Sequence, residues 1–191
     1  ALSMKLRDAE KNGKLPKIVM PVHFAGQSCD MINIKKLSEK YGFKIIEDAS
    51  HAIGGVYKNT KIGSCKFSDI TVFSFHPVKI ITTAEGGCAT TKDENIFEKL
   101  KLLSSHGVTR NPKNMVNKTL DKWVYDQISI GFNYRMSDLN AALGLSQLLR
   151  IDSFINKRNK IAKKYFQQLK NLDLKLPKQE DYNSCLLYTS P

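Results

Sequence analysis

One lysine, Lys79, follows a short apolar run that predicts a strand. The run from Ile70 to Phe75 is rich in β-branched and aromatic residues and is bounded by Asp69 and Pro77, a pattern typical of a strand buried on both faces. Ligands of open α/β sheets bind beyond the carboxyl ends of the strands. A lysine that loses its hydration there has a lowered pKa and can act as an amine nucleophile that forms Schiff bases. The alternative is a surface lysine in a lysine-rich chain.

A carboxylate, Asp48, stands in a similar place after another predicted strand, which covers 43–47. It is followed three residues later by His51. Asp48 either faces a cationic partner or caps the next turn through its side chain. Because the sequence names no partner for this carboxylate, the cap is the favoured interpretation.

The elements that must position these residues follow from apolar periodicity and from turn residues. We expect helices over 1–12, 30–41, 94–103 and from 138 onwards, and strands over 17–24, 43–47, 70–75 and 87–91. Strand, helix and strand over 17–47 make a βαβ unit with parallel strands. Gly42 is placed to end the second helix, and 57–59 predicts a hairpin tip. Ile96, Phe97, Leu100 and Leu103 are expected to face inward, and 104–126 is expected to be a long irregular loop.

The composition limits the classes of partner. The 191 residues are 41% hydrophobic and 25% charged, as in ordinary soluble globular proteins. The net charge of +12 suggests nucleic acid, but the lysines are dispersed along helical stretches such as 157–170 and form no basic platform with interleaved aromatic residues. We therefore expect no nucleic-acid partner, and a positive field that favours an anionic small-molecule substrate.

The four cysteines and four histidines show neither disulfide nor metal-ligand spacing. No apolar run is long enough to span a bilayer, and the first residues lack a signal-peptide pattern. We expect reduced thiols, no metal, no membrane insertion and a cytoplasmic location.

Six segments together resemble the PLP-dependent sugar aminotransferases of the DegT type. They are PVHFAGQSCDM (21–31), IIEDASHAIGG (45–55), GSCKFSDITVFSFHPVK (63–79), TTAEGG (82–87), SSHG (104–107) and GFNYRMSDLNAALGLSQL (131–148). The resemblance implies an α/β fold, the PLP-dependent transferase fold type I, with a mainly parallel sheet flanked by helices. Residues 21–31 and 123–144 are most similar to the C4 aminotransferases of pseudaminic acid biosynthesis. Those enzymes move an amino group from L-glutamate to a UDP-linked 4-keto-6-deoxy-N-acetylhexosamine.

The resemblance also implies a role for each candidate residue around the cofactor, pyridoxal 5'-phosphate. Lys79 would be the Schiff-base lysine, and it would later move a proton between the substrate and the cofactor. Asp48 would pair with the pyridine nitrogen and keep it protonated. His51 would lie near the phenolic oxygen, and Ser74 would donate its hydroxyl to the phosphate.

Three further residues would act at the substrate side or across subunits. By the resemblance, Asn133 would reach the phosphate from the neighbouring subunit, so the active site would need a homodimer. Arg135 is a candidate for dimer or substrate contacts, and His76 is a candidate for lining the substrate side. The nucleotide-sugar and L-glutamate are the partners that this interpretation implies.

Residues 1–150 are expected to be part of the large PLP-binding domain, and 151–191 the connecting helix and the start of a small domain. Relative to the family, the chain lacks an upstream segment that holds the phosphate and stacks on the ring, and its tail 184–191 does not resemble the family. A truncated chain is therefore expected.

Several alternatives stay open at this stage. Another sugar aminotransferase, of surface polysaccharide or antibiotic sugar synthesis, fits the same motifs. Some relatives dehydrate sugars with a histidine in place of the Schiff-base lysine, and Lys79 argues against that reaction. A regulator or fragment that acts only as a binding scaffold is the non-enzymatic alternative.

Overall fold

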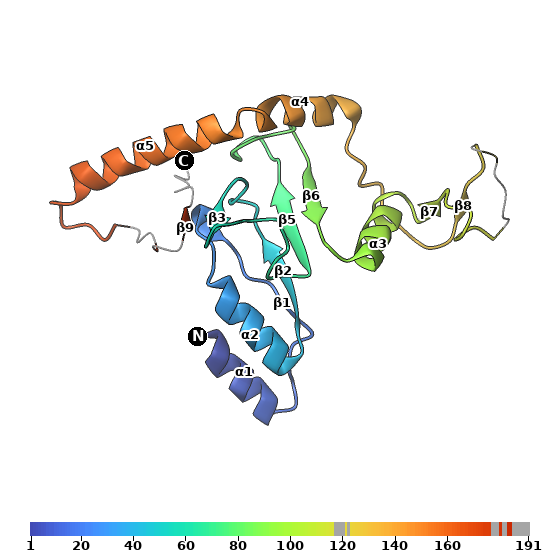
Figure 1. The fold of residues 1–191 in the computed structure, drawn as a ribbon, viewed down its shortest axis with the longest axis horizontal. Coiled ribbons are helices and arrows are strands. Elements are labelled where there is room, and N and C mark those ends of the chain that lie inside the picture. Colours follow the sequence, from blue (N-terminus) through green and yellow to red (C-terminus); the bar gives the residue numbers. More distant parts are fainter. Residues whose placement is uncertain (117–120, 122, 177–179, 181–182, 185–191) are drawn as a thin grey trace. The chain divides into compact units, whose positions relative to one another are not determined.

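The structure is a computed structural model that describes residues 1–116, 121, 123–176, 180 and 183–184 (Figure 1). The contacts within the chain divide it into two units. The first contains Ala1–Lys92 and Leu139–Pro191, and the second contains Asp93–Asp138. The expected boundary at residue 150 stays a prediction.

The centre of the first unit is a four-stranded sheet in the order β1-β2-β5-β6 (Figure 1). Its strands are β1 (Ile18–Val19), β2 (Lys44–Asp48), β5 (Ile70–Ser74) and β6 (Gly87–Thr90). The first three are parallel, and β6 runs antiparallel to β5. The mainly parallel sheet and the βαβ unit are thereby confirmed.

The strand expected over 17–24 is much shorter than predicted. β1 ends at Val19, because Pro21 has no N–H for a sheet hydrogen bond. Pairing resumes at a bridge between Val22 and Asp48. The chain then turns through a short 3₁₀ helix, η1 (Phe24–Gly26).

Two helices build the main core against one face of the sheet. α1 (Leu2–Lys11) and α2 (Met31–Tyr41) lie close to their predicted positions. Gly42 ends α2 in the left-handed conformation, with φ +77°, as a glycine at this cap position allows. The core residues come from α1, α2, β2, β3 and the turn before β2: Leu6, Met31, Tyr41, Phe43, Ile45 and Tyr57.

Two further helices, α4 (Asp138–Leu148) and α5 (Ile151–Leu169), follow the second unit. The long helix expected from residue 138 is thus two helices separated by a turn at 149–150. α5 belongs to a second apolar cluster, around the segment that carries Lys79: Ile53, Phe75, Ile80, Ile81, Ile151, Phe154 and Ile155.

The predicted hairpin tip is confirmed. β3 (Val56–Tyr57) and β4 (Thr60–Lys61) pair antiparallel across a two-residue loop. Lys58 and Asn59 in that loop have φ values of 43° and 61°, as a type I′ turn requires at both positions. β9 (Asn183–Ser184) pairs with the other edge of β3.

The second unit contains α3 (Glu94–Ser104) and a small antiparallel pair, β7 (Val108–Thr109) and β8 (Asp126–Gln127). Of the apolar residues of α3 expected to face inward, Ile96 and Leu100 are half-buried, whereas Phe97 and Leu103 are exposed. For those two residues the expectation is wrong, and α3 contains no fully buried residue. A unit of this size has too little chain to enclose a core of its own.

Candidate active site

The carboxyl ends of β2 and β5 place two candidate side chains on one face of the sheet. Asp48 lies opposite Val72 in the parallel register of the two strands. Side chains two residues apart in a strand share a face, so Ser74 lies on the same face as Val72 and Asp48. This is the end of the sheet where the sequence placed the ligand.

The backbone N–H and carbonyl of Asp48 both bond to the segment 21–23. Its N–H donates to the carbonyl of Pro21 (2.9 Å), and its own carbonyl accepts from the N–H of His23 (2.9 Å). Its carboxylate accepts from the N–H of Ser50 (3.0 Å), so the predicted cap is confirmed. Burial raises the pKa of Asp48, but the Ser50 hydrogen bonds and the charges of His51 and His23 outweigh it and lower the pKa below its ordinary value. The carboxylate is therefore ionised at neutral pH.

Lys79 follows β5 in a turn and is half-buried. Its N–H donates to the carbonyl of His76 (2.9 Å), which fixes the backbone beside the strand end. Burial lowers the pKa of His51, the Lys79 ammonium lowers it further, and the Asp48 carboxylate raises it. The His51 imidazole is thus within electrostatic reach of both the Lys79 amine and the Asp48 carboxylate.

Ser74 and His76 line the segment between β5 and Lys79. The hydroxyl of Ser74 accepts from the N–H of His76 (3.4 Å), and this arrangement lets its O–H donate to an anionic oxygen. The His76 ring accepts from the N–H of Val78 (3.4 Å) and lies 4.0 Å from the carboxylate of Glu85. His76 is exposed, so its ring is accessible at this edge.

Two residues of this region were missed by the sequence analysis. Phe24 is 73% exposed, and its ring centroid lies 5.9 Å from that of His51. The sequence signal for Phe24 was an aromatic residue just beyond the carboxyl end of a strand, where ligands of α/β sheets bind. Glu47, next to Asp48, is buried and bound to His23, and the apolar pattern of β2 gave no sign of that pair.

Asn133 and Arg135 belong to the second unit. Asn133 forms a bridge with Ser105, and Arg135 is exposed. The structure thus brings together Asp48, His51, Ser74 and Lys79 in the first unit, and the roles of Asn133 and Arg135 stay predictions.

The residues that the structure describes contain no group of three or more His, Cys, Asp and Glu side chains that could hold a metal ion. None of the described helices is long and apolar enough to cross a membrane. The candidate side chains at the site are an amine, an ionised carboxylate, an imidazole and a hydroxyl.

The sequence and the fold are similar to those of known aminotransferases. The sequence model of the DegT/DnrJ/EryC1/StrS aminotransferase family matches residues 9–190. The UDP-4-amino-4,6-dideoxy-N-acetyl-beta-L-altrosamine transaminase of Campylobacter jejuni is 40% identical over 187 residues, which cover 97% of this chain and 46% of that protein.

Solved structures of similar fold belong to the same group. PseC of Helicobacter pylori, an aminotransferase involved in the biosynthesis of pseudoaminic acid, matches with a TM-score of 0.75 and 36% identity over 84% of this chain and 40% of its own. The putative sugar aminotransferase Spr1654 of Streptococcus pneumoniae, in its PMP-form, matches with a TM-score of 0.77 and 30% identity over 90% of this chain and 48% of its own. The chain thus spans less than half the length of these relatives.

Proposed function

The chain belongs to the DegT/DnrJ/EryC1/StrS aminotransferase family, and we propose that the protein transfers an amino group from L-glutamate to a keto group of a nucleotide-linked deoxy-sugar. The proposed acceptor is C4 of a UDP-4-keto-6-deoxy-N-acetylhexosamine. The observation that carries this proposal is the pairing of β2 with β5, which brings Asp48 and His51, after β2, to the same end of the sheet as Lys79, after β5. The similarity to a UDP-sugar transaminase over nearly the whole chain supports the sugar class.

Aminotransferases of this family use pyridoxal 5'-phosphate, and the residues present fit that group. Lys79 would hold it through its ε-amine. The ionised Asp48 would face the pyridine nitrogen, and Ser74, on the same sheet face, would donate its hydroxyl to the phosphate. His51 would lie beside the ring. When bound, the cofactor supplies a protonated pyridine ring that acts as an electron sink.

The roles of the protein groups follow from their charges. The carboxylate of Asp48 would keep a proton on the pyridine nitrogen, because its lowered pKa leaves it ionised. His51 is neutral at pH 7, since burial and the Lys79 ammonium lower its pKa. Its ring can therefore donate or accept a hydrogen bond without placing a positive charge beside the cofactor. Lys79 is the group that would take a proton from the substrate carbon and return it.

A homodimer with a shared site is part of the proposal. Asn133 is proposed to reach the cofactor phosphate of the partner, and Arg135 and His76 are proposed to contact the substrate. Large exposed apolar side chains support an interface, including Ile130 at 90% exposure in the second unit and Leu139 at 85% in the first. The absence of a nucleic-acid partner and the cytoplasmic location stay predictions.

The test uses the protein expressed from its complete reading frame. With PLP, L-glutamate and the UDP-linked keto-sugar, we expect one 2-oxoglutarate for each amino-sugar formed, measured by mass spectrometry. Lys79→Ala is the control and should form neither product. A PLP-loaded wild-type protein that forms no amino-sugar from this substrate contradicts the proposed acceptor.

The shared site has a test of its own. Lys79→Ala and Asn133→Ala should each be inactive alone. After unfolding and refolding together, hybrid dimers contain one site with neither change, and a 1:1 mixture should recover about a quarter of wild-type activity. No recovery in a mixture shown to contain hybrids contradicts the contribution of Asn133 across subunits.

A further inference from the structure

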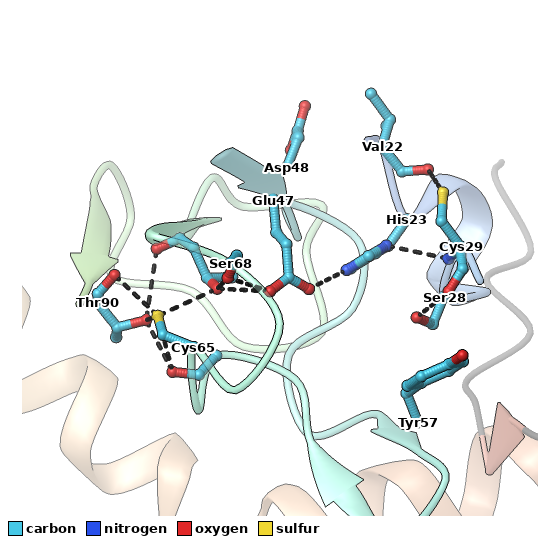
Figure 2. Close-up of polar contacts among 12 residues, drawn as sticks. Val22, His23, Ser28, Cys29, Glu47, Asp48, Tyr57, Cys65, Ser68 and Thr90 are labelled. Atoms are coloured by element: carbon cyan, nitrogen blue, oxygen red, sulfur yellow. Dashed lines mark hydrogen bonds and ion pairs between the residues drawn. The ribbon is translucent and has the colours of Figure 1, made fainter. Parts of the chain in front are cut away.

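A buried ion pair lies on the side of β2 opposite to Asp48. The Nε2 of His23 lies 2.7 Å from the Oε2 of Glu47, and the two residues are 0% and 5% exposed. Figure 2 shows the Glu47 side chain directed at His23, with the Asp48 side chain pointing away from both. The alternation of side chains along a strand produces this arrangement.

Every part of the pair has a partner. The other carboxylate oxygen of Glu47 accepts from the hydroxyl of Ser68 and from that of Thr71 (3.2 Å). The peptide N–H of Cys29 donates to the Nδ1 of His23 (3.2 Å), so the neutral form of the ring carries its proton on Nε2, facing Glu47. The network is closed, so it offers no group to a ligand (Figure 2).

The charges of the pair stabilise each other. Burial opposes the charged ring, but the side chains of Cys29 and Glu47 outweigh it and raise the pKa of His23 to about 9. Burial also opposes the Glu47 carboxylate, yet hydrogen bonds from His23 and Ser68 lower its pKa below the ordinary value. A second proton on Nδ1 has to displace the hydrogen bond from the Cys29 N–H.

The same histidine also holds Asp48. Its peptide N–H donates to the Asp48 carbonyl (2.9 Å), while its ring holds Glu47, the preceding residue of the strand. His23 therefore fixes two consecutive residues of β2, one through its backbone and one through its side chain. Its charge is also one of the causes that lower the pKa of Asp48.

Such a pair is not needed for stability alone, because buried ion pairs are often no more stabilising than apolar residues of similar shape. We propose that His23 and Glu47 are positioning residues that fix the end of β2, so that the Asp48 carboxylate keeps its place against the pyridine nitrogen of PLP. This inference rests on the role of Asp48 in the proposed function.

The decisive variant is Glu47→Gln, and Tyr57→Phe is its matched control. A glutamine at position 47 can still accept hydrogen bonds from the hydroxyls of Ser68 and Thr71. Its uncharged amide, through the NH₂ group or the oxygen, then takes the place of the carboxylate that faces His23. Tyr57 is equally buried in the same core, and its hydroxyl donates to Asp30 (2.7 Å) and accepts from the Ile32 N–H (3.2 Å). Tyr57→Phe therefore removes buried hydrogen bonds that are remote from Asp48.

The readouts are the PLP dissociation constant, the pH midpoint of the bound cofactor's absorbance change, and the melting temperature of the cofactor-free protein. We expect both variants to melt at lower temperature, and only Glu47→Gln to weaken PLP binding, by about tenfold, the lower end of what supporting residues contribute to ligand sites. Only Glu47→Gln should move the absorbance midpoint.

If Glu47→Gln binds PLP as tightly as the wild type and has the same absorbance midpoint, the inference is overturned. The proposed function still stands in that case, because the wild-type protein binds PLP. A wild-type protein that binds no PLP overturns both. If Glu47→Gln does not fold, His23→Gln and His23→Ala decide: the glutamine can still donate to Glu47 and should restore PLP binding relative to the alanine. Equal binding in these two variants also overturns the inference.

Discussion

Glu47 and Asp48 are consecutive residues of β2 whose side chains lie on opposite faces of the sheet. Glu47 is enclosed with His23 beneath the strand, and Asp48 faces the edge where Lys79 and His51 lie. The strand thus has a buried pair on one face and, on the other, a carboxylate that is available for chemistry. The predictions below test the two faces separately.

Asp48→Asn should fold like the wild type and lose most of the aminotransferase activity. An asparagine oxygen can still accept from the Ser50 N–H, so the turn after β2 is retained. The loss of the negative charge should lower kcat/KM by about 100-fold or more, as when one preorganised electrostatic partner is removed. Asp69→Asn is the control, because Asp69 also accepts from a peptide N–H, that of Ile45 (2.8 Å), before the other end of β5. Equal losses of kcat/KM in Asp48→Asn and Asp69→Asn contradict the role of Asp48 at the pyridine nitrogen.

Lys79→Met should raise the pKa of His51. The ammonium of Lys79 disfavours the imidazolium, and its removal leaves burial as the cause that lowers this pKa and Asp48 as the cause that raises it. The measurement is an NMR titration of the His51 ring in the cofactor-free protein, with Lys66→Met as control. An unchanged His51 titration in Lys79→Met means that the amine and the imidazole are not neighbours.

The pH dependence of stability should report on His23. Its pKa rises from 6.5 to about 9 in the folded protein, so the stabilisation is complete below pH 6.5 and is lost as the pH rises to about 9. The slope is at most about 1.4 kcal/mol per pH unit. Urea unfolding from pH 6.5 to 9 should show this decline in the wild type and not in His23→Gln. A flat wild-type profile means that the Cys29 N–H keeps Nδ1 unprotonated.

Gly144→Ala should destabilise the protein although alanine favours helices. A Cβ at Gly144 would lie 2.6 Å from the Cγ2 of Thr83, which is buried in the loop after Lys79. We expect the free energy of unfolding to fall by about 1 to 3 kcal/mol from overpacking.

Thr83→Ser provides the check on this contact. It removes the Cγ2 and keeps the hydroxyl that donates to the Glu85 carbonyl (2.8 Å). The double variant should recover most of the stability that Gly144→Ala loses. Strictly additive losses in urea unfolding contradict a direct contact between α4 and this loop.

Much of the first unit could be predicted from the sequence, because its signals are local. Gly42 ends α2 and the 58–59 turn closes the hairpin for conformational reasons that depend on few neighbours. Asp48 caps its turn through a contact only two residues away. The edge of the sheet that carries Asp48 and Lys79 followed from the rule that ligands bind beyond the carboxyl ends of the strands in α/β sheets.

The parts that could not be predicted depend on contacts between distant residues. His23 and Glu47 are 24 positions apart, and no local pattern shows that they are paired. The exposure of Phe97 and Leu103 on α3 depends on which distant segments pack against that helix. Phe24 approaches His51 only because η1 turns the chain back after β1.

The most direct test of the account is to locate the lysine that holds the cofactor. The protein from its complete reading frame is loaded with PLP, reduced with borohydride and digested, and the pyridoxyl-lysine is mapped by mass spectrometry. We predict one labelled residue, Lys79, and no label in Lys79→Ala. A label on another lysine, or none on a folded protein loaded with PLP, contradicts the assignment of this site.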